Sequence, residues 1–206
     1  VPLVILALEK AIKASSLAWS LAGSIALSFQ VLAGYPAMVF YTVIRLFIVF
    51  LWHMVRIHQK EKIIRALIRP ALFSAILPAT AVLLCAVQLI PTLVMTPHSA
   101  RSGGVSYEFA TSFSMPPENV FNFILPYLFG DMAGKVYWGR WYLWDMLAYV
   151  GILPLFLLVA AGLSSKNKGR MFLFIAGVSV LLSFGGYAGY YRLLYKYVPG
   201  FSMFRS

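Results

Sequence analysis

Five long apolar stretches, each close to the length that crosses a lipid bilayer, dominate the sequence. They cover residues 15–34, 37–55, 71–95, 143–163 and 171–190. A membrane-spanning helix needs about 20 consecutive apolar residues. The chain is 61% hydrophobic and only 11% charged, whereas charged residues make up about 25% of a soluble domain. We therefore exclude an ordinary soluble domain and predict an all-α polytopic membrane protein with about five transmembrane helices.

The beginning of the chain favours a fragment of a longer protein. Residues 1–8 are apolar but too short to span a bilayer, so we expect them to be the inner end of a sixth, truncated helix. No initiator Met and no basic region typical of a signal peptide precede them. We expect the 206 residues to form a single transmembrane domain from within a larger protein.

Basic residues gather on one side of the predicted membrane. With the spans alternating in direction, one side holds ten Lys and Arg residues against only Glu9 and Glu61, a net charge of +8. The other side carries +2, and Arg45 falls inside a span. Loops rich in Lys and Arg lie in the cytoplasm. The loop 96–142 and the C-terminal end should therefore face outward, and we assign the formal charge of +11 to topology and membrane lipids, not to nucleic acid.

The connection of residues 96–142 is long and rich in aromatic residues. A long loop without regular structure is usually functional or disordered, and disordered segments contain few aromatic residues. We therefore predict a large, ordered extracytoplasmic loop that caps the membrane domain. Beyond it, Gly185 and Gly186 weaken the last span after Ser183, and residues 190–197 are predicted to form an amphipathic helix in the membrane interface. The aromatic residues of the loop are Phe109, Phe113, Phe121, Phe123, Tyr127, Phe129, Tyr137, Trp138 and Trp141.

A series of short segments runs through most of the chain. In order they are QVLAGYP (30–36), QLIPT (88–92), SAR (99–101), SMPPEN (114–119), LPYLFG (125–130), YWG (137–139), YVGILP (149–154) and PGFSMFR (199–205). Together they resemble the bacterial YfhO family of polytopic membrane proteins. Two positions depart from that family's pattern: Tyr35 stands where His is common, and Asp145 stands where Glu is common.

The resemblance implies a glycosyltransferase-C-like membrane fold in the bacterial cytoplasmic membrane. It further implies transfer of a sugar from a polyprenyl-phosphate donor to a cell-envelope glycan acceptor on the outer face. Enzymes of this fold place their key acidic residue in the first outward loop. That loop would precede residue 1, so we expect the general base to lie upstream and assign none within the chain.

Lipid-phosphate binding needs cations, and four basic residues are candidates. Arg192 and Lys196 are four residues apart, so they share one face of the predicted interfacial helix; ordinary contact with lipid headgroups is the alternative. Arg101 sits in a turn-prone segment and is a candidate for binding substrate or phosphate. Arg45, deep in a span, should face a cavity and have a partner; this partner would lie in helices outside the chain.

Four carboxylates lie on the predicted outer side. Glu118 follows two prolines and fits the first turn of a helix, a structural alternative to a role in substrate binding. Asp145 lies at the edge of a span, where a charge is often functional, although pairing with Arg140 is the competing explanation. Glu108 and Asp131 are weaker catalytic candidates. We assign no metal site and no cofactor, but leave a divalent cation open because Asp131 could contribute one ligand.

Two other classes of function remain open. Kinked spans, the Gly185-Gly186 pair and Arg45 would suit a lipid or solute transporter, but related halves with paired broken helices are missing. A non-catalytic membrane scaffold subunit is the other alternative. The single Cys85 lies in an apolar span and is interpreted as a small buried hydrophobic residue.

Overall fold

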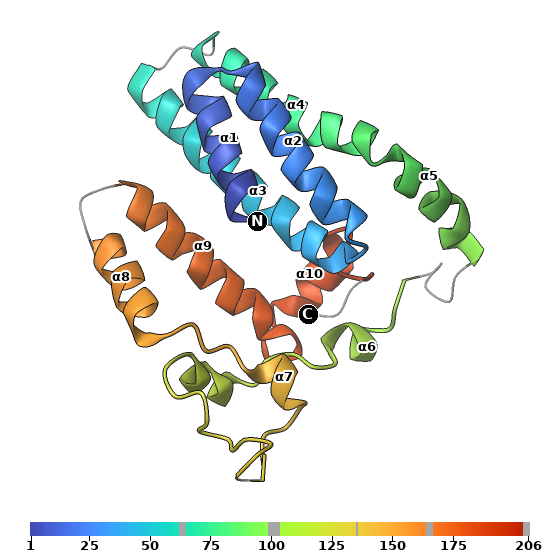
Figure 1. The fold of residues 1–206 in the computed structure, drawn as a ribbon, viewed down its shortest axis with the longest axis vertical. Coiled ribbons are helices and arrows are strands. Elements are labelled where there is room, and N and C mark those ends of the chain that lie inside the picture. Colours follow the sequence, from blue (N-terminus) through green and yellow to red (C-terminus); the bar gives the residue numbers. More distant parts are fainter. Residues whose placement is uncertain (62–64, 99–103, 135, 164–166, 204–206) are drawn as a thin grey trace. The chain divides into compact units, whose positions relative to one another are not determined.

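The computed structural model describes residues 1–61, 65–98, 104–134, 136–163 and 167–203 (Figure 1). Every regular element in this part of the chain is a helix, which confirms the all-α prediction. The chain divides into two compact units, Val1–Gly103 and Gly104–Ser206. We describe each unit by itself.

Unit 1 is a helical bundle followed by a bent-off helix. Its elements are α1 (Pro2–Ala14), α2 (Leu17–Leu32), α3 (Pro36–Glu61), α4 (Arg65–Leu84), α5 (Ala86–Met95) and the 3₁₀ helix η1 (Thr96–His98). Helix α1 packs against α2, α3 and α4. Its apolar side chains are buried at Val4, Leu8 and Ile12. The segment predicted as the end of a truncated span is therefore part of a 13-residue helix at the centre of this bundle.

A row of serines joins α2 to α4. Side chains four residues apart lie on the same face of a helix. The hydroxyls of Ser20 and Ser24 donate hydrogen bonds to the carbonyls of Phe73 (2.8 Å) and Leu77 (2.9 Å) on α4. Gly23 lies beside this row, and a Cβ atom there would stand 2.5 Å from Leu77 Cδ1. Small residues and interhelical hydroxyl bonds are typical of close helix packing in membranes.

The turn between α2 and α3 is held by a polar contact. The Gln30 side-chain amide donates hydrogen bonds to the Thr42 hydroxyl (2.8 Å) and to the Met38 carbonyl (3.1 Å). Thr42 is completely buried. Gly34 has a φ of +78°, a conformation that glycine adopts without the steric penalty of a Cβ atom. Gly34 thus forms the tight turn between α2 and α3.

The predicted span 71–95 is not one helix. Helices α4 and α5 meet at Cys85 with a bend of 71°. Cys85 has φ −94° and ψ 6°, outside the helical region. Its buried thiol lies 3.5 Å from the Ser28 carbonyl, a weak hydrogen bond that fixes the bend point against α2. The burial predicted for this cysteine is confirmed.

Unit 2 contains a helix pair and the greater part of the aromatic loop. Its helices are α6 (Tyr107–Thr111), η2 (Pro117–Phe123), α7 (Leu143–Met146), α8 (Ile152–Leu163), α9 (Asn167–Ser183), η3 (Gly185–Tyr187) and α10 (Tyr191–Tyr197). Helices α8 and α9 pack against each other as neighbours (Figure 1). Helix α9 ends at Ser183, before the glycines, as predicted.

The prediction of a continuous span over 143–163 is wrong. Helix α7 has only four residues, and α8 begins at Ile152 after a non-helical stretch. Gly151 has a φ of +91°, which a continuing helix cannot contain. Pro154 lies in the first turn of α8, where its missing N–H leaves no helical bond unmade. The local residues thus start a new helix here.

One described helix, the 36–58 part of α3, is long and apolar enough to cross a membrane, and α4 with α5 would make a second if the bent pair counts as one span. Helices α2, α8 and α9 are apolar but shorter, with 16, 12 and 17 residues. The five-span arrangement stays a prediction.

Candidate functional site

The loop segment that begins with Ser114 is tied to the end of α9. The Gly186 N–H donates a hydrogen bond to the Ser114 hydroxyl (2.9 Å), and the Met115 N–H donates to the Ser183 carbonyl (2.8 Å). Ser114 and Met115 are both buried. Gly186 is needed there because a Cβ atom would stand 2.8 Å from the Thr111 side chain. This part of the loop is ordered, as predicted.

An ion pair joins two further parts of the loop. Glu118 lies in the first turn of η2, which confirms the predicted helix start after the two prolines. Its carboxylate oxygen lies 2.9 Å from Arg140 Nε, and the Arg140 guanidinium lies 5.8 Å from the ring centre of Tyr187. Arg140, the alternative partner predicted for Asp145, thus pairs with Glu118. Both side chains remain partly exposed, so solvent weakens their attraction.

Two buried asparagines of η2 were missed by the sequence analysis. Asn119 and Asn122 are 1% and 2% exposed. Residues three apart eclipse each other in a 3₁₀ helix, so both side chains lie on its buried face. The Asn122 amide donates a hydrogen bond to the Met146 carbonyl (3.2 Å), which ties η2 to α7. The spacing of three residues after Pro-Pro was the available signal in the sequence.

Asp131 holds a tight turn. Its carboxylate accepts hydrogen bonds from the backbone N–H groups of Ala133 (2.9 Å) and Gly134 (2.5 Å). Beside it, Gly130 has a φ of +94°, and a Cβ atom there would stand 2.5 Å from the Val136 carbonyl oxygen. Short side-chain acceptors commonly close turns in this way. This geometry assigns Asp131 a structural contact and weakens its candidacy as a catalytic base.

The other predicted carboxylates are exposed. Glu108 lies in the first turn of α6, whose N-cap Ser106 accepts a hydrogen bond from the Phe109 N–H (3.2 Å). Asp145 lies on the short helix α7 and is also exposed. Arg101, the third cation predicted to bind phosphate on the outer side, lies outside the described residues.

Helix α10 carries the two predicted phosphate-binding cations. Arg192 and Lys196 are both exposed, one turn apart, as the spacing predicts. The Arg192 guanidinium lies 5.3 Å from the ring centre of Tyr107 on α6. Lys196 lies 5.3 Å from the ring centre of Tyr197. Each cation thus lies against an aromatic ring, and the rest of its surface is open to solvent or to an anion.

Tyr137 has a buried hydroxyl beside the Arg140 segment. No described residue supplies a hydrogen-bond partner for this hydroxyl. Burial raises the pKa of Tyr137 above the usual 10.0 because the charged phenolate would lose its hydration. Gly139 lies so close that a Cβ atom would overlap the Tyr137 ring. The Tyr-Trp-Gly segment is thus a close-packed turn.

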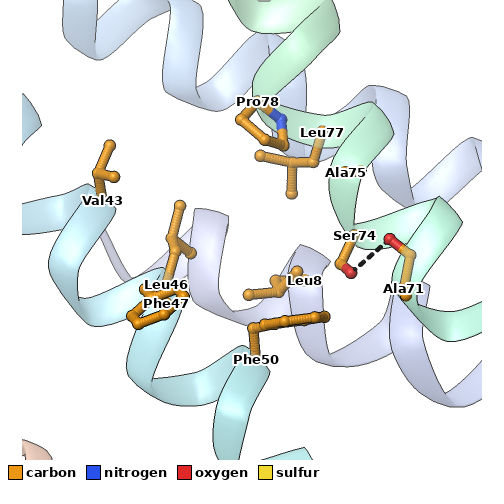
Figure 2. Close-up of a pocket in the computed structure, with 10 residues that line it drawn as sticks. All are labelled: Leu8, Val43, Leu46, Phe47, Phe50, Ala71, Ser74, Ala75, Leu77 and Pro78. Carbon is orange, nitrogen blue, oxygen red and sulfur yellow. Dashed lines mark hydrogen bonds between the residues drawn. The ribbon is translucent and has the colours of Figure 1, made fainter. Parts of the chain in front are cut away.

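Unit 1 contains an apolar cavity of about 250 Å³ (Figure 2). It lies between α1, α3 and α4. The one hydroxyl of its lining, Ser74, donates to its own helix at the carbonyls of Pro70 (2.8 Å) and Ala71 (2.9 Å). Such a cavity suits hydrocarbon and not a polar solute. It is lined by Leu8, Val43, Leu46, Phe47, Phe50, Ala71, Ser74, Ala75, Leu77 and Pro78.

Arg45 does not belong to this lining. Consecutive residues of a helix are about 100° apart, so Arg45 is rotated roughly 200° from Val43, which lines the cavity. Arg45 is half-buried and lies one turn from Tyr41 on α3. The expectation that Arg45 faces a cavity is therefore not met by the cavity that unit 1 contains.

Among the residues that the structure describes, no three His, Cys, Asp or Glu side chains gather as a metal-binding group. Comparison with protein-family models, with curated proteins and with solved structures found no match to this chain. The class that the fold defines is an all-α protein with at least one helix able to cross a membrane.

Proposed function

We propose that the chain is the central part of a membrane glycosyltransferase. It would transfer a sugar from a polyprenyl-phosphate donor to a cell-envelope acceptor on the outer face of the bacterial cytoplasmic membrane. The observation that carries this proposal is the order of the loop. Its Ser114–Asn119 segment, which belongs to the resemblance described above, is hydrogen-bonded to the end of α9 and paired with Arg140.

The loop has the features of a recognition cap. Four aromatic rings pack one after another. The ring centre of Phe113 lies 5.0 Å from that of Trp141 and 5.5 Å from that of Tyr142, and the Tyr142 and Trp144 rings stack with their centres 5.1 Å apart. Exposed aromatic rings suit the apolar faces of sugars, and the cations of α10 suit a phosphate. We assign phosphate binding to Arg192 and Lys196.

We assign no catalytic base among the described residues. Asp131 closes a turn and Glu118 is paired with Arg140, so two of the four outward carboxylates have structural contacts. The same observation favours a second candidate function, a non-catalytic membrane scaffold that binds the lipid without reacting it. Only a measurement of sugar transfer distinguishes the transferase from the scaffold.

Equilibrium binding tests the proposal. The purified protein in lipid nanodiscs is titrated with polyprenyl phosphate and with the polyprenol of equal length. Tighter binding of the phosphate is expected, and the double variant Arg192→Gln, Lys196→Gln should weaken it about tenfold or more, as loss of two charge-assisted contacts would. Arg170→Gln, an exposed cation at the other end of α9, is the matched control and should bind like the wild type.

Equal binding of phosphate and alcohol would contradict a phosphate site. Phosphate-selective binding without release of sugar from a polyprenyl-phosphate sugar, in the complete protein with its acceptor, would favour the scaffold over the transferase.

A further inference from the structure

Within the described part of unit 1, no other element buries helix α5. None of its residues is buried; Leu89 is half-buried, and five large apolar side chains are exposed, from 57% at Val94 to 78% at Val87. Ile90 and Leu93 lie within that range at 61% and 69%. A helix of a folded protein normally buries its apolar stripe. The apolar surface of α5 therefore requires an occupant.

The apolar surface of α5 is wider than a packed helix face. The polar residues Gln88, Thr92 and Thr96 recur every four residues and form one narrow stripe. The hydroxyls of Thr92 and Thr96 turn back onto the carbonyls of their own helical turn, both at 2.7 Å. The rest of the circumference is apolar and carries no charge. A partner helix would cover one face, whereas lipid chains can cover most of the circumference.

The angle between α4 and α5 argues against one continuous straight crossing. The apolar part of α4, residues 70–84, has 15 residues, about 22 Å, which is most of the hydrocarbon core but not all of it. Helix α5 has ten residues, about 15 Å, too short for a second crossing. The bend of 71° turns α5 to roughly 20° from the membrane plane when α4 stands along the membrane normal.

We propose that α5 is an in-plane membrane helix whose partner is the lipid surface. Its apolar side chains enter the acyl chains, and the Gln88–Thr92–Thr96 stripe faces the headgroups. This inference rests on the membrane placement of α3 and α4 in the proposed function, but not on sugar transfer. Because α5 has no charge, apolar burial and not anionic lipid holds it there.

Depth-dependent fluorescence quenching tests the inference. In a Cys85→Ser background, which keeps a side-chain donor for the Ser28 carbonyl at the bend, single labels are placed by Val87→Cys, Val94→Cys, Gln88→Cys and, at the centre of the 36–58 stretch of α3, Phe47→Cys. The labelled proteins are reconstituted in phosphatidylcholine vesicles that contain lipids brominated near the glycerol or near the chain end. Aqueous iodide serves as the second quencher.

An in-plane helix predicts equal depth for Val87 and Val94, with the strongest quenching by the shallow bromines. It predicts deep quenching at Phe47 and stronger iodide quenching at Gln88. Seven residues separate Val87 from Val94, about 10 Å along a helix, so a crossing helix would make their depths differ by that distance. Such a difference in depth would overturn the inference. A lack of lipid quenching at Val87 and Val94, while Phe47 is quenched, would also overturn it, because it would indicate that a protein partner covers α5. A lack of lipid quenching at Phe47 would instead remove the membrane placement of the proposed function, and the inference with it.

Discussion

The Arg140 side chain connects two segments of the loop with the short helix η3. Its guanidinium joins the 137–142 segment to Glu118 of η2 and to the ring of Tyr187 on η3. Both partners of the ion pair are partly exposed, so the pair itself contributes little stability. Its function in this account is to set the position of η2, which also carries the buried Asn119 and Asn122.

A double-mutant cycle over Glu118→Gln and Arg140→Gln measures this ion pair. We expect a coupling free energy below about 1 kcal/mol that decreases further at high salt, because exposed pairs are screened. Both single variants should change the unfolding free energy of the loop to a similar degree. If Glu118→Gln alone abolished sugar transfer while Arg140→Gln did not, Glu118 would be a catalytic residue and the structural assignment would be wrong.

The raised pKa of Tyr137 predicts that the unfolding free energy depends on pH in the alkaline range. Its pKa is raised in the folded chain, so the unfolded chain loses this proton first, at about pH 10. Its contribution to stability is complete below pH 10 and is lost as the pH rises through the folded pKa. Tyr137→Phe removes the group that titrates, and it removes a buried hydroxyl that has no partner among the described residues.

We therefore expect Tyr137→Phe to lose less unfolding free energy than the wild type between pH 9 and 11, measured by denaturant titration in detergent. Tyr127→Phe, at an exposed ring, is the control and should follow the wild type. A parallel decline of the Tyr137→Phe and wild-type curves would contradict the prediction.

Among the elements, the apolar stretches 15–34 and 37–55 predicted the positions of α2 and α3 well, and α9 overlaps the stretch 171–190. The Gly34 turn and the end of α9 at Ser183 also followed from local residue types. Helix breaks without an interior proline were harder to find. The bend at Cys85 depends on its contact with Ser28 on α2, which is distant in sequence and leaves no local signal.

Candidate site residues were predictable only as residue types. The cations of α10 and the carboxylates were found from sequence, since charges outside the apolar stretches are conspicuous. The turn contact of Asp131 and the pairing of Arg140 with Glu118 depend on how the loop folds back on itself. Asn119 and Asn122 were missed because they are polar and uncharged, and only the fold of the loop shows that they are buried.

The close packing of α2 on α4 gives an element-scale prediction. In Gly23→Ala the new Cβ would stand 2.5 Å from Leu77 Cδ1 and 3.0 Å from Ala7 Cβ, and Leu77 is completely buried. We expect the unfolding free energy to fall by about 1–3 kcal/mol, because overpacking shifts the helices apart. Gly177→Ala in α9, where nothing lies within 4 Å, is the matched control and should be neutral or stabilising by up to about 1 kcal/mol. Equal effects of the two changes would show that Gly23 is not a packing residue.

In the molecule as a whole, the two units differ in their chemical features. Unit 1 has an apolar cavity of about 250 Å³ and the helix most suited to crossing a membrane. Unit 2 has the aromatic loop and the exposed cations Arg192 and Lys196. We propose that unit 2 by itself binds the anionic head of a lipid-linked phosphate.

Photocrosslinking with two polyprenyl-phosphate probes tests this claim most directly. One probe carries its photoreactive group next to the phosphate and the other at the far end of the chain, and mass spectrometry locates the labelled peptides. The account predicts that the phosphate-proximal probe labels residues 104–146 and 190–203, and that excess polyprenyl phosphate, but not polyprenol, prevents this labelling. Labelling confined to the basic segment 56–70, or equal competition by the alcohol, would contradict it.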